Sequence, residues 1–252
     1  DRELFESGNR AAALAGEEPA TGRRANPVFL PAPHEVVRAF HRAFTEPPQL
    51  AGDPWFHESI LHSLSIIFWA FFWSCLIGVP LGLLCGSFSI FSRLVEPGVD
   101  FIRYMPAPVF GALMVAVFGL ADAPKVAVIF IGTFFQMVLV VAHTTRLLDR
   151  ALLEAAQTLG AGRRQLVMNV ILPGVLPKLF NDLRILLGWA WTYLIVAELI
   201  GAKSGITAYI DQQSRYFNFD LVYAAIIVIG VIGLVTDQIL QLASRALFPW
   251  EH

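Results

Sequence analysis

The residues that could carry chemistry are scattered along the 252-residue chain. Cys75 and Cys85 are ten positions apart and have no neighbouring Cys or His at the spacing of metal ligands. An enzyme site would need paired carboxylates, a histidine cluster or a Ser/His pair held together. The six histidines are scattered and form no cluster: His34, His41, His57, His62, His143 and His252. These observations argue against an enzyme, a disulfide framework and a metal centre.

A nucleotide site is not predicted either. A loop that cradles phosphates requires Gly, four residues, and then Gly-Lys-Ser/Thr. The nearest sequence is Gly201–Ser204, in which alanine and not glycine precedes the lysine. We therefore expect the chain to bind no ATP itself.

The segment from Asp149 to Gly160 predicts a short helix suited to contact with another molecule. Asp149 is a good N-cap, and Gly160 is a residue at which helices end. One face carries small and apolar residues at helical spacing: Leu152, Ala155, Ala156 and Leu159. A second helix is expected at 163–170, before Leu172-Pro173. Such a pair could receive force from a soluble partner, or could lie on lipid headgroups; the spacing leaves both readings open.

The composition is that of a membrane protein. Hydrophobic residues make up 56% of the chain, charged residues 15%, and the mean hydropathy is +0.61. A soluble domain carries about 25% charged residues. The net charge of -2 and the lack of a dense Lys/Arg run exclude nucleic acid as the main partner.

Charge-free intervals predict about five membrane helices. No Asp, Glu, Lys or Arg occurs for 34 residues between Glu58 and Arg93, enough for one span of about 20 residues, which we place near 61–84. The other spans are expected at 104–121, 126–145, 185–197 and 221–236. Backbone polar groups must be paired within lipid, and the two-residue alternation of a barrel is absent. The fold class is therefore expected to be an all-α membrane protein.

Five residues in or beside these spans are candidates for lining a solute pathway: Gln136, His143, Trp191, Thr192 and Glu198. Polar side chains are expensive in lipid and tend to face the bundle interior or a wet path. The alternatives are that His143 and Glu198 reach water at helix ends, and that Trp191 serves in packing or as an interface anchor.

Basic residues predict the orientation, because they favour the cytoplasmic side. The segment 143–184 carries six of them: Arg146, Arg150, Arg163, Arg164, Lys178 and Arg184. We therefore expect 1–58 to be a polar external arm that contains a short amphipathic helix. The transmembrane domain would span 59–246, with a cytoplasmic loop at 146–178, and 247–252 would be a cytoplasmic tail.

Several motifs resemble those of ABC importer permeases. Glu154-Ala155-Ala156, Gly160-Ala161 and Leu172-Pro173 match the EAA loop of these proteins. The resemblance extends over roughly 28–250 and points to the nitrate, sulfonate, taurine and bicarbonate branch. It rests on four further segments: Leu30–Pro33, Pro80–Gly82, Leu183–Trp191 and Ala197-Glu198. The segment 103–108 lacks the proline that this branch usually has after the arginine, and the first of the six family helices is missing.

The resemblance implies a type I importer helix bundle in the bacterial inner membrane, with the chain as a multi-pass transporter subunit and not an enzyme. Two permease chains, as a homodimer, would form the pathway, and two cytoplasmic ATPases would carry ATP and Mg, while the chain itself holds no cofactor. A periplasmic binding protein would deliver the solute. The residues that contact the ATPase would be Glu154, Ala155, Ala156, Leu159, Gly160, Ala161, Leu172 and Pro173.

The solute class implied by the resemblance is a small oxyanion or sulfonate. One alternative is an importer of a small nitrogen compound related to urea. The other is a channel, although the sequence shows no repeated selectivity element. The orientation places Asp1 outside without an apolar signal segment. We therefore expect a further helix upstream, linked through 1–26, with a cleaved signal peptide as the alternative.

Overall fold

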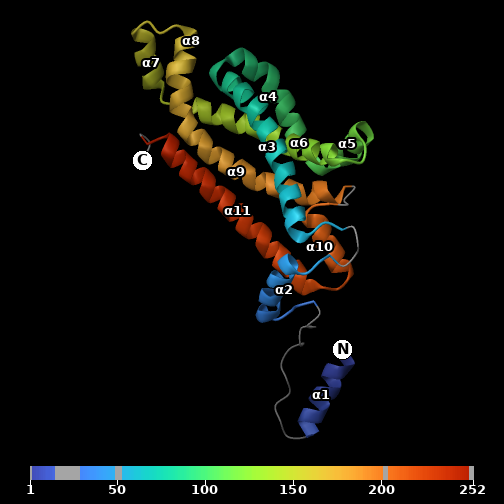
Figure 1. Cartoon of the computed structure of the whole chain (residues 1–252). Coiled ribbons are helices and arrows are strands. Elements are labelled where there is room, and N and C mark those ends of the chain that lie inside the picture. The colour runs from blue at the N-terminus through green and yellow to red at the C-terminus, as the bar shows by residue number, and fades with distance from the viewer. Residues whose placement is uncertain (1, 15–28, 49–52, 201–203, 250–252) are drawn as a thin grey trace. The chain divides into compact units, whose positions relative to one another are not determined.

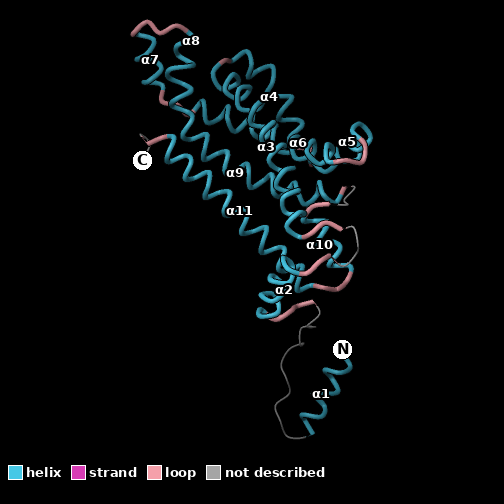
Figure 2. Tube along the Cα trace, in the orientation of Figure 1, coloured by secondary structure: helices cyan, strands magenta, loops and turns pink. Residues whose placement is uncertain are grey.

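The computed structural model describes residues 2–14, 29–48, 53–200 and 204–249 (Figure 1). Regular structure within these ranges is helical and includes no strand (Figure 2), which confirms the all-α fold class. The chain divides into two compact units, one formed by 1–46 and 210–226 and the other by 47–209 and 227–252. Gly201–Lys203, which resembles part of a phosphate-binding loop, lies outside the described residues.

The first unit contains α1 and α2 and parts of two later helices. α1 spans Arg2–Leu14, and α2 spans Pro33–Thr45, within the segment 1–58 in which a short amphipathic helix is expected. α10 (Ile206–Arg215) and α11 (Phe219–Leu247) each contribute residues to both units.

The second unit contains the other helices. In chain order they are α3 (Phe56–Ser87), α4 (Ser89–Arg103), η1 (Ala107–Phe110), α5 (Gly111–Phe118), α6 (Asp122–Arg146), α7 (Arg150–Thr158), α8 (Arg163–Leu166), η2 (Val167–Ile171) and α9 (Leu172–Leu199).

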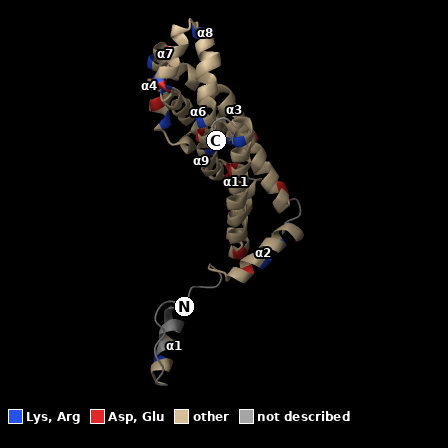
Figure 3. Cartoon of the chain, turned by 90° about the vertical axis from the view of Figure 1, so that its left-hand side faces the viewer, with Lys and Arg blue, Asp and Glu red and all other residues tan. Residues whose placement is uncertain are grey.

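Three described helices are long and apolar enough to cross a membrane: α3, α6 and α11. Figure 3 shows long stretches of α3 and α11 that lack charged residues. α9 covers the expected span at 185–197 and is 28 residues long, but it is not among the three and carries Lys178, Asp182 and Arg184 in its first half.

The span expected at 104–121 does not form a membrane helix of its own. α5 has only eight residues, and the segment qualifies as a span only together with α4, from which it is bent by 88°. Pro106 and Pro108 explain the break, because proline lacks the backbone donor and clashes with the preceding turn of a helix. Gly119, at φ 78°, then ends α5.

The core of the second unit forms where α6 packs against α3 and α9. One cluster in this core contains buried apolar residues from α6, α9 and the connection between them: Met137, Val141, Leu148, Ile171, Val175, Leu179 and Leu186. Gly82 and Gly86 of α3 allow the close approach, since a Cβ at either would lie 2.6 or 2.5 Å from the Cβ of Val141 or Thr145. Small residues at a spacing of four are a common device for packing membrane helices closely.

Candidate functional site

α7 has the ends that its sequence predicts. The backbone N–H of Ala151 donates to Asp149 Oδ1 at 2.9 Å, which caps the first turn. At the other end Ala161 N–H donates to Ala156 O at 3.0 Å, and Gly160 N–H donates to Gln157 O at 2.9 Å. Gly160 has φ +82°. This is a Schellman motif, in which glycine takes the left-handed position because a side chain would be strained there.

The predicted contact face of α7 is uncovered. No residue of α7 is buried, and Leu152 and Leu159 are 53% and 89% exposed. Glu154, Ala155 and Gly160 are exposed as well. Leu152 in α7 and Leu159 directly after it leave this face apolar and open, either to a partner or to lipid headgroups.

α7 and the residues just before it contact other helices of the second unit. Leu148, just before α7, is 9% exposed and belongs to the buried cluster around Met137 and Val141, against which Leu153 of α7 also packs. A Cβ at Gly174 of α9 would lie 2.8 Å from Leu148 Cδ1, so the two segments touch. Arg146 forms an ion pair with Glu96 of α4. A displacement of α7 would therefore be transmitted to α4, α6 and α9.

The second helix of the pair continues directly into α9. The sequence predicts a helix at 163–170, whereas α8 ends at Leu166 and a π-helical segment, η2, follows and runs into α9 at Leu172. Leu172 is half-buried and Pro173 is exposed. Proline is tolerated there because α9 begins at this point.

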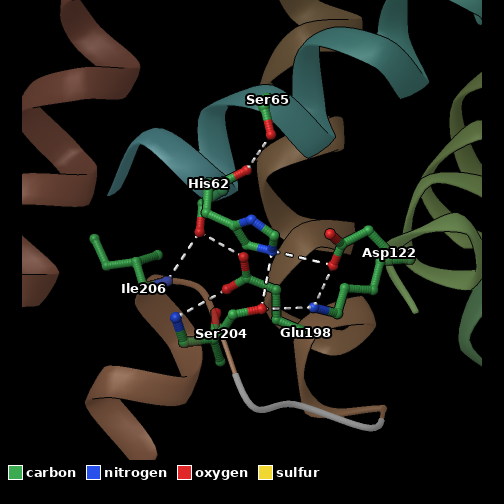
Figure 4. Close-up of polar contacts among 9 residues, drawn as sticks. His62, Ser65, Asp122, Glu198, Ser204 and Ile206 are labelled. Atoms are coloured by element: carbon green, nitrogen blue, oxygen red, sulfur yellow. Dashed lines mark hydrogen bonds and ion pairs between the residues drawn. The ribbon is translucent and has the colours of Figure 1, made fainter. Parts of the chain in front are cut away.

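A second candidate region surrounds Glu198 at the end of α9 (Figure 4). Its side chain is 0% exposed. Ser63 of α3 donates its hydroxyl to Oε1, and the backbone N–H of Thr207 donates to Oε2 at 2.9 Å. Ser63 Oγ in turn accepts from the N–H of Ile206 at 2.9 Å. Glu198 therefore ties the ends of α3 and α9 to the first turn of α10, where unpaired N–H groups favour a negative charge.

A network of four polar side chains lies beside Glu198. His62 Nε2 is 3.1 Å from Asp122 Oδ1 and 2.9 Å from Ser204 Oγ. Lys125, which is 4% exposed, donates to Asp122 at 2.9 Å and to Ser204 at 3.3 Å. Among the described residues, no group of three His, Cys, Asp or Glu side chains could hold a metal ion.

The other pathway candidates have different surroundings. Gln136 and Trp191 are half-buried, whereas His143 and Thr192 are exposed. The buried indole N–H of Trp191 has no hydrogen-bond partner among the described residues. No hydrogen bond within the described part of the chain links these four residues to one another, and their role in a pathway stays a prediction.

Several contacts between helices could not be predicted from the sequence. Ser63 and Thr207 hold Glu198, and Arg146 connects α6 to α4. Arg184 of α9 donates to both carboxylate oxygens of Asp237 in α11, at 2.8 and 2.7 Å. An arginine and an aspartate in apolar helices indicate that such an ion pair can form. Because 53 residues separate Arg184 from Asp237, the sequence does not show that these two are partners.

Comparison with known proteins identifies a family. Residues 78–249 match the family described as "Binding-protein-dependent transport system inner membrane component". A probable ABC transporter permease protein of Brucella abortus is 33% identical and aligns with 89% of this chain and 87% of its own length. The taurine transport system permease protein TauC of Escherichia coli is 31% identical over 92% of this chain and 83% of its length. A putative aliphatic sulfonates transport permease protein of Escherichia coli is 34% identical over 88% and 82%.

Solved structures show the same fold. A structure of the MetNI methionine ABC transporter in an inward-facing conformation superposes with a TM-score of 0.68 at 19% identity, over 75% of this chain and 94% of that chain. The family assignment rests on three observations: the helices α6 to α9 with their EAA sequence, the all-helical fold, and the match over residues 78–249. The chain belongs to the family of binding-protein-dependent inner-membrane permeases of ABC importers, in the nitrate, sulfonate and taurine branch.

Proposed function

We propose that this permease couples solute transport to an ATPase partner through α7. The observation that carries the proposal is the exposed face of α7, with Leu152 and Leu159 uncovered on a helix whose two ends are fixed by hydrogen bonds. An amphipathic helix laid in a hydrophobic groove is a common mode of recognition. The ATPase would supply that groove, and Glu154, Ala155, Ala156, Leu159, Gly160 and Ala161 would be the contact residues.

The mechanical argument follows from how α7 is attached. Leu148 sits in the core between α6 and α9, and Arg146 reaches α4. Packed cores transmit displacement and do not absorb it. Movement of the ATPase would therefore shift the helices that enclose the pathway, with Leu172 and Pro173 at the start of α9 taking part.

The partners of the complex follow from the same proposal. Two ATPase subunits hold ATP and Mg²⁺, this chain pairs with a second permease copy, and a binding protein delivers solute on the opposite face. One fold relative, at a TM-score of 0.56 and 15% identity, is a bacterial alginate ABC transporter in complex with a pentasaccharide-bound periplasmic protein. We place the chain in a bacterial inner membrane.

The solute class is a small oxyanion or sulfonate. Its support is that relatives are named for taurine, aliphatic sulfonates and nitrate. Much of the discrimination would reside in the delivering protein. Calorimetry on the binding protein of the same transport system, with taurine, nitrate and bicarbonate as ligands, tests the class. The proposal expects one of them to bind and urea not to bind.

The coupling role is tested with the purified transporter in proteoliposomes. A tagged permease should co-purify with its ATPase, and the loaded binding protein should stimulate ATP hydrolysis. Solute flux that needs neither ATP nor the binding protein would identify a channel and refute the proposal.

The orientation gives a separate prediction. Cysteines introduced at Arg163, in the loop after α7, and at Arg215, at the end of α10 and 77% exposed, should react with a membrane-impermeant thiol reagent from opposite sides. The reason is that basic residues collect on the cytoplasmic side. The measurement uses intact cells and inverted vesicles, in a background in which Cys75 and Cys85 are replaced. Reaction of both cysteines in intact cells would refute the orientation.

A further inference from the structure

The first unit contains a cavity of about 410 Å³ between α2 and the corner that joins α10 to α11. Pockets for small ligands have volumes of about 300–1,000 Å³. The lining combines charged and aromatic side chains: Pro31, Glu35, Arg38, Arg42, Phe217, Phe219 and Asp220. The coupling mechanism uses none of these residues.

One charged group in this cavity forms no ion pair with a described residue. Arg42 forms an ion pair with Asp220, and Glu35 accepts the backbone N–H of Ala32 at 2.8 Å through Oε2. Arg38 is exposed, and no described residue forms an ion pair with it. Within the described part of the chain, the cavity thus presents an exposed guanidinium without an ion-pair partner for an oxyanion, next to two carboxylates whose remaining lone pairs can accept from an ammonium group.

Phe217 forms a wall of the cavity in a strained conformation. Its φ is 60°, and it is the non-glycine residue with positive φ in the described chain. Phe217 N–H donates to Ser214 O at 3.1 Å and Asn218 N–H donates to Gln213 O at 3.0 Å, so the phenylalanine stands where a helix end normally has glycine. Its ring is 62% exposed and lies 6.3 Å from the ring of Phe29. Strained backbone positions of this kind cluster at functional sites.

The position of the cavity along α11 places it among lipid headgroups. α11 has 29 residues and is apolar enough to span a membrane. Its length is about 43 Å at 1.5 Å per residue, whereas the hydrocarbon core is about 30 Å thick. The charge-free stretch 221–236 begins directly after Asp220, so the first turn lies at headgroup depth. Phe219 and Asp220 belong to that turn and line the cavity. Tyr216 and Tyr223, on either side of this turn, are exposed and are of the residue type found in the aromatic belt at this depth.

α2 adds a surface for lipid beside the cavity. It exposes three apolar side chains at spacings of three and four residues: Val37, Phe40 and Phe44, which are 71%, 44% and 38% exposed. Ala39 and Ala43 are buried, and Arg42 fixes α2 to the first turn of α11 (Figure 1). A helix with this pattern lies in the membrane interface with its apolar stripe in the acyl region.

We propose that this cavity binds a zwitterionic headgroup with an oxyanion and a primary ammonium group, and that its source is a phosphoethanolamine phospholipid. Arg38 holds the phosphate, Glu35 and Asp220 accept from the ammonium, and the rings of Phe217 and Phe219 cover the ethylene link. Lipid is the source because the cavity lies at headgroup depth and borders an exposed apolar stripe. The site is separate from the coupling function, so the failure of one proposal leaves the other standing.

The test uses the whole permease, with its co-purifying subunits, delipidated in detergent. Phosphatidylethanolamine, phosphatidylcholine and phosphatidylglycerol are titrated separately, and the lipid concentration at half-maximal thermal stabilisation is measured. Phosphatidylethanolamine should act at a concentration at least about tenfold lower than the other two, because choline has no N–H donor and glycerol has no cation. Arg38→Gln should raise that concentration about tenfold, while Arg10→Gln, at another exposed arginine, should not change it.

Phe217→Gly separates ligand binding from folding. Glycine relieves the backbone strain, so the variant should be at least as stable as the wild type without lipid and yet need about tenfold more phosphatidylethanolamine. Equal responses to the three lipids, or an unchanged titration for Arg38→Gln and Phe217→Gly, would overturn the proposal. Saturable micromolar binding of free taurine or O-phosphoethanolamine without lipid would also overturn it. The same holds if Arg38→Gln loses its response to the binding protein while its lipid titration stays unchanged.

Discussion

Gly160→Glu is expected to lower ATP-driven uptake by about 100-fold while leaving the amount of inserted permease unchanged. Gly160 is exposed, and no atom lies within 4 Å of the position that a Cβ would occupy, so the chain itself has room for a side chain. The loss has two causes: the left-handed backbone at φ +82° disfavours any side chain, and a carboxylate would be buried unpaired against the ATPase. An unpaired buried charge at an interface costs about 3 kcal/mol, which corresponds to roughly 100-fold.

Two variants on the same surface separate these causes. Gly160→Ala introduces the backbone strain without the charge and should lower the coupling activity by less than about tenfold. Gln157→Glu adds the same charge on the side of α7 away from Leu152 and Leu159, and should behave as the wild type. The measurement is co-purification with the ATPase together with stimulated ATP hydrolysis. Normal co-purification and hydrolysis in Gly160→Glu would show that α7 is not the coupling surface.

α7 could be predicted because its signals are local. An N-cap aspartate, an apolar face and a terminal glycine occur within twelve residues, and each acts through neighbours in sequence. The structure has the helix, the cap and the left-handed glycine at the expected positions. The continuation of α8 through η2 into α9 was not predicted, because a π-helical turn has no marker in the residues 167–171.

The environment of Glu198 could not be predicted for the opposite reason. Ser63 is 135 residues away in sequence, and the donor at Thr207 is a backbone group that any residue would supply. From sequence, a glutamate near the end of a span is equally compatible with a wet pathway and with exposure to water. Its complete burial under the first turn of α10 depends on how three helices meet.

The bent segment between α4 and α6 shows the limit of charge counting. The interval 104–121 lacks charge, and hydropathy alone therefore predicts one span. Pro106 and Pro108 are visible in the sequence but ambiguous, since prolines are tolerated in membrane helices where neighbours pair the freed carbonyls. Here they end the helix, and the two pieces meet at 88°.

Glu198→Ala is expected to lower the free energy of unfolding by roughly 3 kcal/mol. The Ser63 hydroxyl and the Thr207 N–H would each lose a buried acceptor, at about 1–3 kcal/mol apiece. For a chain of this size the midpoint of thermal unfolding should fall by about 10 °C. Glu154→Ala, at an exposed glutamate of α7, is the matched control and should leave the midpoint unchanged. An unchanged midpoint with altered transport kinetics in Glu198→Ala would instead assign this carboxylate to the pathway.

A double-mutant cycle with Gly205 tests whether the carboxylate acts by holding the turn before α10. An added Cβ at Gly205 would lie 2.2 Å from Glu198 Oε1, and the φ of this residue is +109°. Gly205→Ala alone should therefore cost about as much as Glu198→Ala, from the clash and the backbone strain together. In the Glu198→Ala background the clashing atoms are gone and only the strain remains, so the second substitution should cost less by at least about 1 kcal/mol. Thermal unfolding of the four proteins measures this coupling, and purely additive losses would mean that the carboxylate and the turn do not act as one unit.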